Sequence, residues 1–175
     1  ITVFTLGNKE KKYKNIDIAK NVIAKCQELT NRNIDQHIIR NADVQTKQEL
    51  FNTEFLSYVD NGRLKILYTG FTSNPPQHVT ESFKNKTEIE IRSPDIVKPF
   101  YHRDNTIYTP FANIDKTTIA NMYTELDVMD SLFPVTRSCE WKESIRGWAA
   151  DDPGLEHCGT CWWCEERLWA FNKLS

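Results

Sequence analysis

Four cysteines near the C-terminus constrain the fold more than any other feature of the chain. Cys139 stands alone, and Cys158, Cys161 and Cys164 follow as an evenly spaced triplet. Ligands at positions i, i+3 and i+6 can converge on one cation where a loop turns into a helix, and Cys139 supplies the fourth corner of a tetrahedron. We therefore predict a closed four-cysteine zinc site that fastens a long loop to a C-terminal helix.

A metal ion held by four sulfurs indicates a structural role. Zinc that performs hydrolysis keeps a position open for water, usually beside His or carboxylate ligands. Two disulfides or unrelated buried thiols are the alternatives. Disulfides need an oxidising compartment, whereas the chain shows no signal-peptide pattern and has an odd cysteine, Cys26, in a helical stretch. His157 could replace one thiolate, although we favour an exposed neighbour of the site.

Composition narrows the class of protein. The 175 residues, with 39% hydrophobic residues and a net charge of -2, fit one globular domain with its own core. This weak negative charge argues against a protein that coats nucleic acid, so we expect no direct nucleic-acid partner. We find no apolar run typical of a membrane span. The basic cluster at residues 9–14 is either a polyphosphate site or, as we prefer, a solvated loop.

Strand and helix patterns alternate through the first part of the chain. The sequence predicts strands at 1–6, 34–40 and 64–69, and helices at 16–29 and 46–59. Right-handed crossovers between such strands give an α/β fold, with a parallel sheet covered by helices on both faces.

The later part of the chain is less regular. Prolines and charged residues between 75 and 106 predict a loop region with at most short elements. A strand then ends at Pro110. A helix follows, with Asp115 or Asn113 as its N-cap.

These C-terminal motifs resemble the 7-cyano-7-deazaguanine synthases, the QueC-type branch of the ATP pyrophosphatases. The resemblance rests on Thr109-Pro110-Phe111, on Asp115-Lys116 opening a helix, on Thr136-Arg-Ser-Cys139, and on Cys158-Gly-x-Cys161-x-x-Cys164-x-x-Arg167. It implies an adenine nucleotide alpha-hydrolase-like (PP-loop ATPase, Rossmann-like) fold. In that fold residues 1–130 form a nucleotide-binding α/β core lacking the first strand and the PP-loop. Residues 131–175 form a zinc-binding region packed on the same domain.

The resemblance also implies an activity. Members of this family use ATP with Mg²⁺ to adenylate 7-carboxy-7-deazaguanine, form the amide with ammonia, and adenylate again to give the nitrile preQ0, a queuosine precursor. We therefore expect a cytoplasmic carbon–nitrogen ligase with structural Zn²⁺, small-molecule partners and no membrane association, and we leave a homodimer open. The alternatives are another PP-loop ATPase that modifies a nucleobase or tRNA, for example by thiolation, and a non-catalytic zinc-stabilised binding module.

Candidate site residues follow from the resemblance. It implies that Lys116 lies near the nucleotide phosphates or substrate as a catalytic residue. Arg167 would bind a carboxylate or phosphate with its planar guanidinium, and a helix-surface ion pair is the alternative. Strand ends near the adenine would bind the cofactor through Phe4, Thr5, Leu6 and Gly70. We expect Glu165 and Glu166 to be solvated.

Some features depart from the family pattern. The family's SGGxDS loop, which grips pyrophosphate at the start of a helix, does not occur in these residues. Because residues 1–6 correspond to the family's second strand, we expect that loop in a segment N-terminal to Ile1. The stretch between Cys139 and Cys158 is long for the family and carries Trp141, Trp148, Asp151 and Asp152.

Aromatic residues surround the predicted zinc ligands. Trp162, Trp163 and Trp169 either stack on a planar substrate or, as we prefer, form a hydrophobic cluster around the metal.

Overall fold

The computed structural model describes residues 1–7, 15–41, 49, 53, 55–84, 99–102, 106–139 and 157–175. The basic cluster at 9–14, much of the predicted helix at 46–59, and the stretch with Trp141, Trp148, Asp151 and Asp152 lie outside these residues. Within the described ranges, no helix has the length and apolar character needed to cross a membrane.

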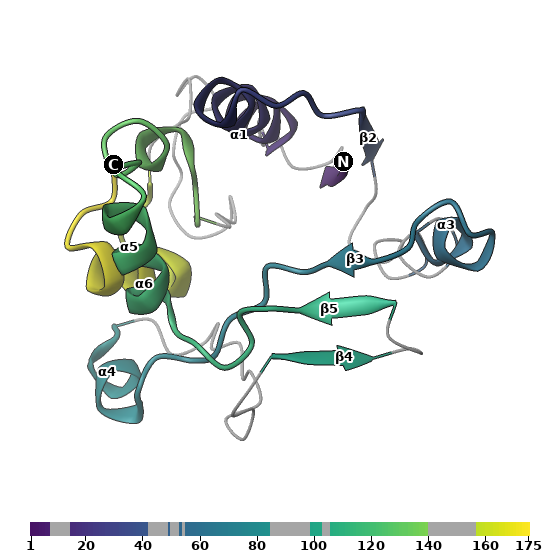
Figure 1. The fold of residues 1–175 in the computed structure, drawn as a ribbon. Coiled ribbons are helices and arrows are strands. Elements are labelled where there is room, and N and C mark those ends of the chain that lie inside the picture. The colour runs from purple at the N-terminus through teal and green to yellow at the C-terminus, as the bar shows by residue number, and fades with distance from the viewer. Residues whose placement is uncertain are drawn as a thin grey trace.

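The N-terminal part forms a two-stranded parallel sheet. Strand β1 (Thr2–Gly7) pairs with β2 (Gln36–Asn41) along their whole length, and helix α1 (Asn15–Thr30) lies between them in the chain (Figure 1). Helix α1 ends at Thr30, and the next residue, Asn31, takes the left-handed conformation with a φ of 51° that favours asparagine or glycine. The two strands and the helix predicted from hydrophobic periodicity are confirmed here, with small shifts of their ends.

A second sheet has three short strands. Strand β5 (Ile107–Thr109) lies between β3 (Leu67–Tyr68), to which it is parallel, and β4 (Phe100–His102), to which it is antiparallel. The mixed α/β class is confirmed, and β1–β2 and β3–β5 are parallel pairs, as predicted. The prediction of a single parallel sheet is wrong for the described strands, because β4 is antiparallel to β5. The described strands form two separate sheets. Few residues separate β4 from β5 in the chain, and antiparallel pairing allows such a short connection, whereas parallel pairing needs a crossover.

Two short helices flank β3. Helix α3 (Leu56–Asp60) ends in a turn at Gly62, whose φ of 66° explains a glycine there. Helix α4 (Gln77–Ser82) begins directly after Pro75 and Pro76. The strand predicted at 64–69 is shorter than expected, and the described residues of the proline-rich stretch include the short helix α4 and the strand β4.

The C-terminal elements pack against one another. Helix α5 (Lys116–Glu125) contacts α6 (Trp162–Phe171), and the short 3-10 helix η2 (Phe133–Val135) lies between them in the chain (Figure 1). The Asp115 carboxylate accepts hydrogen bonds from the backbone N–H groups of Thr117 and Thr118 at 2.9 and 3.3 Å, which confirms Asp115 as the N-cap of α5. The fully buried Phe133 packs against the ring of Phe171 at 4.5 Å between centroids.

Candidate functional site

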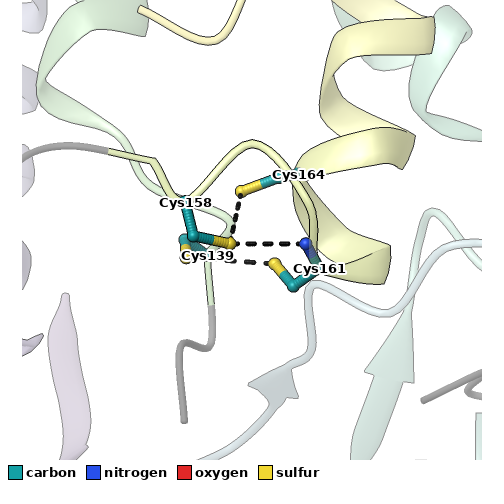
Figure 2. Close-up of side chains that lie close together, drawn as sticks. All are labelled: Cys139, Cys158, Cys161 and Cys164. Carbon is teal, nitrogen blue, oxygen red and sulfur yellow. Dashed lines mark hydrogen bonds between the residues drawn. The ribbon is translucent and has the colours of Figure 1, made fainter. Parts of the chain in front are cut away.

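The four predicted metal ligands converge. The sulfur atoms of Cys139, Cys158, Cys161 and Cys164 all lie within 4.8 Å of one another (Figure 2). The Cys158–Cys164 sulfurs are 3.8 Å apart, and the Cys139–Cys161 sulfurs are 3.9 Å apart. A tetrahedral centre with Zn–S bonds of about 2.3 Å requires sulfurs about 3.8 Å apart, whereas a disulfide requires about 2.05 Å. The thiols are free, and their spacing fits a tetrahedral metal ion.

Local backbone geometry assembles this tetrad. Gly159 adopts a φ of 70°, which turns the chain between the first two members of the triplet. Cys161 is the N-cap residue of α6, and its backbone N–H donates to the Cys158 sulfur at 3.3 Å. Cys164 lies in the first turn of α6, and Cys139 comes from the segment after η2. The tetrad therefore joins a distant segment to the start of α6.

The four thiols of the tetrad cannot all ionise without a cation, because their thiolates would repel one another. Hydrogen bonds from Cys161 and Cys164 hold the pKa of the Cys139 thiol far below its usual range. The pKa of Cys161 is raised to about 12 by its hydrogen bond to Cys139, and that of Cys164 is raised for the same reason. Without metal the thiols share protons, because several thiolates so close together repel one another. A divalent cation would allow all of them to ionise.

His157 is a neighbour of the tetrad and not one of its four members. Its Nδ1 lies 3.9 Å from the Cys164 sulfur, and burial together with the Arg167 charge lowers the pKa of His157 to about 4. The prediction that His157 is exposed is wrong, because its side chain is partly buried against the site.

Acid is expected to release the metal. Cysteine binds metal as the thiolate, so each thiol that loses a proton on binding makes the apparent affinity rise about tenfold per pH unit. Since at least Cys161 and Cys164 are protonated without metal at neutral pH, we expect about 100-fold weaker binding per unit of acidification. Titration with a chromogenic chelator between pH 8 and pH 5 measures this slope, and a pH-independent affinity would contradict thiolate ligation.

Helix α6 connects the tetrad to the rest of the molecule. Trp162 is fully buried and packs edge-on against Phe83 at 4.8 Å, beside Val79 of α4. The Glu165 carboxylate accepts a hydrogen bond from the backbone N–H of Lys84 at 2.8 Å. Trp163 packs against the cysteine cluster, and Trp169 packs against the cluster around Trp162. The preferred interpretation of these tryptophans as a hydrophobic cluster agrees with the structure.

An ion pair between α5 and α6 was missed from sequence. The Lys116 ammonium donates to the Glu166 carboxylate at 2.6 Å, and the Glu166 side chain has no exposed surface. The prediction that Glu166 is solvated is therefore wrong: burial of its carboxylate is compensated by Lys116. The two residues are 50 positions apart in the chain, so no local pattern indicated the pair.

One family model matches almost the entire chain. The model described as queuosine biosynthesis protein QueC covers residues 4–175. The chain belongs to the QueC family. No match came from the comparison with curated proteins, and none came from the comparison with solved structures.

In this QueC-family chain, Arg167 anchors the C-terminal segment. Its Nε donates to the Leu174 carbonyl at 2.8 Å, and its Nη2 donates to the carbonyls of Phe133 and Thr136 at 3.0 and 3.2 Å. Its guanidinium carbon lies 3.7 Å from the centre of the Phe133 ring. Arg167 as a whole is 3% exposed, so the alternative of a helix-surface ion pair is wrong. Substrate binding by Arg167 stays a prediction.

Replacing Arg167 is expected to destabilise the protein by about 3 kcal/mol. Arg167→Met leaves several carbonyl groups without a donor, and hydrogen bonds to charged groups contribute about 1.5–3 kcal/mol each. Arg167→Lys keeps the charge but cannot bridge carbonyls on both sides, so it should recover only part of the loss. Urea unfolding measures both variants. Equal stability of wild type and Arg167→Met would contradict this role.

The predicted cofactor-binding residues occupy two places in the structure. Phe4 packs on Phe55 at 4.1 Å and lines a cavity of about 620 Å³ between β1 and the segment 64–68. The Thr5 hydroxyl lies 2.8 Å from His37 Nε2. Gly70 follows β3, and a Cβ atom added there would meet no atom within 4 Å. The side chain of Leu6 lies outside the described residues. Cofactor binding by these residues stays a prediction.

Proposed function

We propose that this QueC-family protein uses ATP to convert 7-carboxy-7-deazaguanine and ammonia into 7-cyano-7-deazaguanine. The family match over residues 4–175 is the observation that supports the proposal most strongly. Adenylation makes a carboxylate oxygen part of a good leaving group, AMP. The protein must position the reactants and stabilise phosphate charge, with Mg²⁺ as the natural helper.

The loops after β3 and β5 support a ligand site at one edge of the second sheet. The Thr69 hydroxyl donates to the Thr109 hydroxyl at 3.2 Å, and the Ser73 N–H donates to the Ile114 carbonyl at 2.9 Å, so these two loops lie together. Gly70 belongs to the first loop and Lys116 follows the second. Ligands of open α/β sheets bind beyond the carboxyl ends of parallel strands, and a lysine there suits phosphate or carboxylate.

We further propose that the tetrad holds zinc. Four thiolates and tetrahedral spacing favour Zn²⁺, which would fasten the Cys139 segment to α6 and thereby support the packing of α6 on α5. This agrees with treating residues 131–175 as a zinc-binding region packed on the nucleotide-binding core of residues 1–130. From the family match we also expect a PP-loop ATPase fold and a cytoplasmic enzyme.

The assay uses the complete gene product with ATP, Mg²⁺, 7-carboxy-7-deazaguanine and an ammonium salt. Mass spectrometry should detect the nitrile and its amide precursor, and ion-exchange chromatography should detect AMP and pyrophosphate. Omission of ammonium should stop nitrile formation. ATP consumption only in the presence of a tRNA and a sulfur donor would favour a thiolation enzyme. Absence of ATP binding would favour a non-catalytic module.

A further inference from the structure

The fully buried carboxylate of Glu166 has a partner at the proposed active site. Its Oε2 atom lies 2.6 Å from Lys116 Nζ, and the Lys116 side chain is 19% exposed. An ammonium has three N–H donors, so Lys116 keeps donors for a second partner while it is bound to Glu166. The pair is therefore fully buried on the Glu166 side and partly exposed on the Lys116 side.

Both ends of the Lys116 side chain are held. Lys116 is the first residue of α5, directly after the N-cap Asp115, which fixes its backbone. Its ammonium donates to the Glu166 carboxylate of α6. A free lysine side chain carries about 2 kcal/mol of rotamer entropy, which a ligand would otherwise have to overcome. Contact with Glu166 removes much of that freedom before a ligand arrives. Positioning a charged group in advance is a large part of what such a site contributes to catalysis.

Helix α6 fixes Glu166 independently of Lys116. Cys161 and Cys164 anchor the start of the helix at the tetrad, and Arg167 anchors the next turn to three carbonyl groups. Cys164 and Glu166 are two positions apart, so they project about 200° apart around the helix. The tetrad and Lys116 therefore lie on different sides of one anchored helix.

We infer that Glu166 is a positioning residue, which holds the Lys116 ammonium in the orientation needed to contact the anionic substrate or the nucleotide phosphates. This role rests on the proposed function, because it assigns Lys116 to that active site. Glu166 itself touches no substrate. It acts through Lys116.

The experiment compares Glu166→Gln with Glu165→Gln in the complete, metal-loaded protein. The control removes a carboxylate from the adjacent position of the same helix, where it contacts the Lys84 backbone. Steady-state kinetics should show kcat reduced on the order of 10- to 100-fold in Glu166→Gln and unchanged in Glu165→Gln. Rates are expressed per folded molecule, as determined by circular dichroism and metal content. If kcat per folded molecule of Glu166→Gln equals that of wild type, the ion pair of Glu166 with Lys116 has only a structural role.

Nitrogen-15 NMR of lysine ammonium groups supplies a readout that needs no turnover. The Lys116 signal, assigned by its loss in Lys116→Met, should shift on addition of Mg-ATP in wild type and in Glu165→Gln. It should broaden, with little response to Mg-ATP, in Glu166→Gln. An identical Lys116 response in both glutamine variants would overturn the positioning role. Full activity of Lys116→Met would show that Lys116 does not belong to the active site, and the positioning role would then fail. A changed Lys116 signal in Glu166→Gln would in that case show only that Lys116 and Glu166 form an ion pair.

Discussion

Replacing Cys161 with serine is expected to release the metal and to unfold the region around α6. Cys161 supplies a tetrad sulfur, serves as the N-cap of α6 and donates its N–H to Cys158. The binding free energy of a structural metal is also folding free energy, so the loss should reach about 4–5 kcal/mol or more. Metal analysis should show less than one metal ion per chain, and thermal unfolding should begin at a lower temperature.

Cys26→Ser is the matched control for this experiment. Cys26 is a free thiol in α1, far from the tetrad in sequence, and belongs to no candidate metal cluster among the described residues. We expect this variant to keep its metal, with at most a small change in melting temperature. Unchanged metal content and melting temperature in Cys161→Ser would falsify the metal-centre assignment.

Replacing Lys116 with alanine is expected to abolish ATP-dependent turnover and also to destabilise the fold. The substitution leaves the fully buried Glu166 carboxylate without its 2.6 Å partner. Breaking a buried ion pair in this way costs about 3–5 kcal/mol. Chemical denaturation of Lys116→Ala, followed by tryptophan fluorescence, measures the loss of stability.

A double variant separates the two effects of that substitution. Lys116→Ala combined with Glu166→Gln removes both charges, so it should recover much of the stability while turnover stays low. If the double variant is as unstable as Lys116→Ala alone, the buried charge is not the cause. If either variant has wild-type turnover per folded molecule, Lys116 is not a catalytic residue.

The sequence was most informative where a local pattern determines the structure. Cysteine spacing predicted the tetrad because three of its members lie three residues apart where a loop enters a helix, and the structure brings all four sulfurs together. Asp115 directly precedes helix α5, and its side chain caps the helix, as the preference of aspartate for the N-cap position predicts. The family assignment, which depended on the same motifs, is also confirmed.

Contacts between distant segments could not be predicted from such patterns. Glu166 lies in a run of charged residues typical of a solvated helix surface, and only the packing of α5 against α6 buries it. Arg167 resembles a ligand-binding residue in sequence, but its guanidinium contacts carbonyls supplied by η2 and the C-terminal segment. The antiparallel β4 was missed because it directly follows Pro99, in a stretch whose prolines and charged residues predict a loop.

The cavity beside Phe4 is lined by residues of two strands, 2–4 of β1 and 67–68 of β3. Among the described strands, β1 pairs with β2 alone and β3 pairs with β5 alone, so each of these strands has one edge without a partner strand. A ladder places backbones about 4.8 Å apart, and unpaired edges accept further strands readily. Each of these edges therefore offers backbone N–H and C=O groups to a further strand.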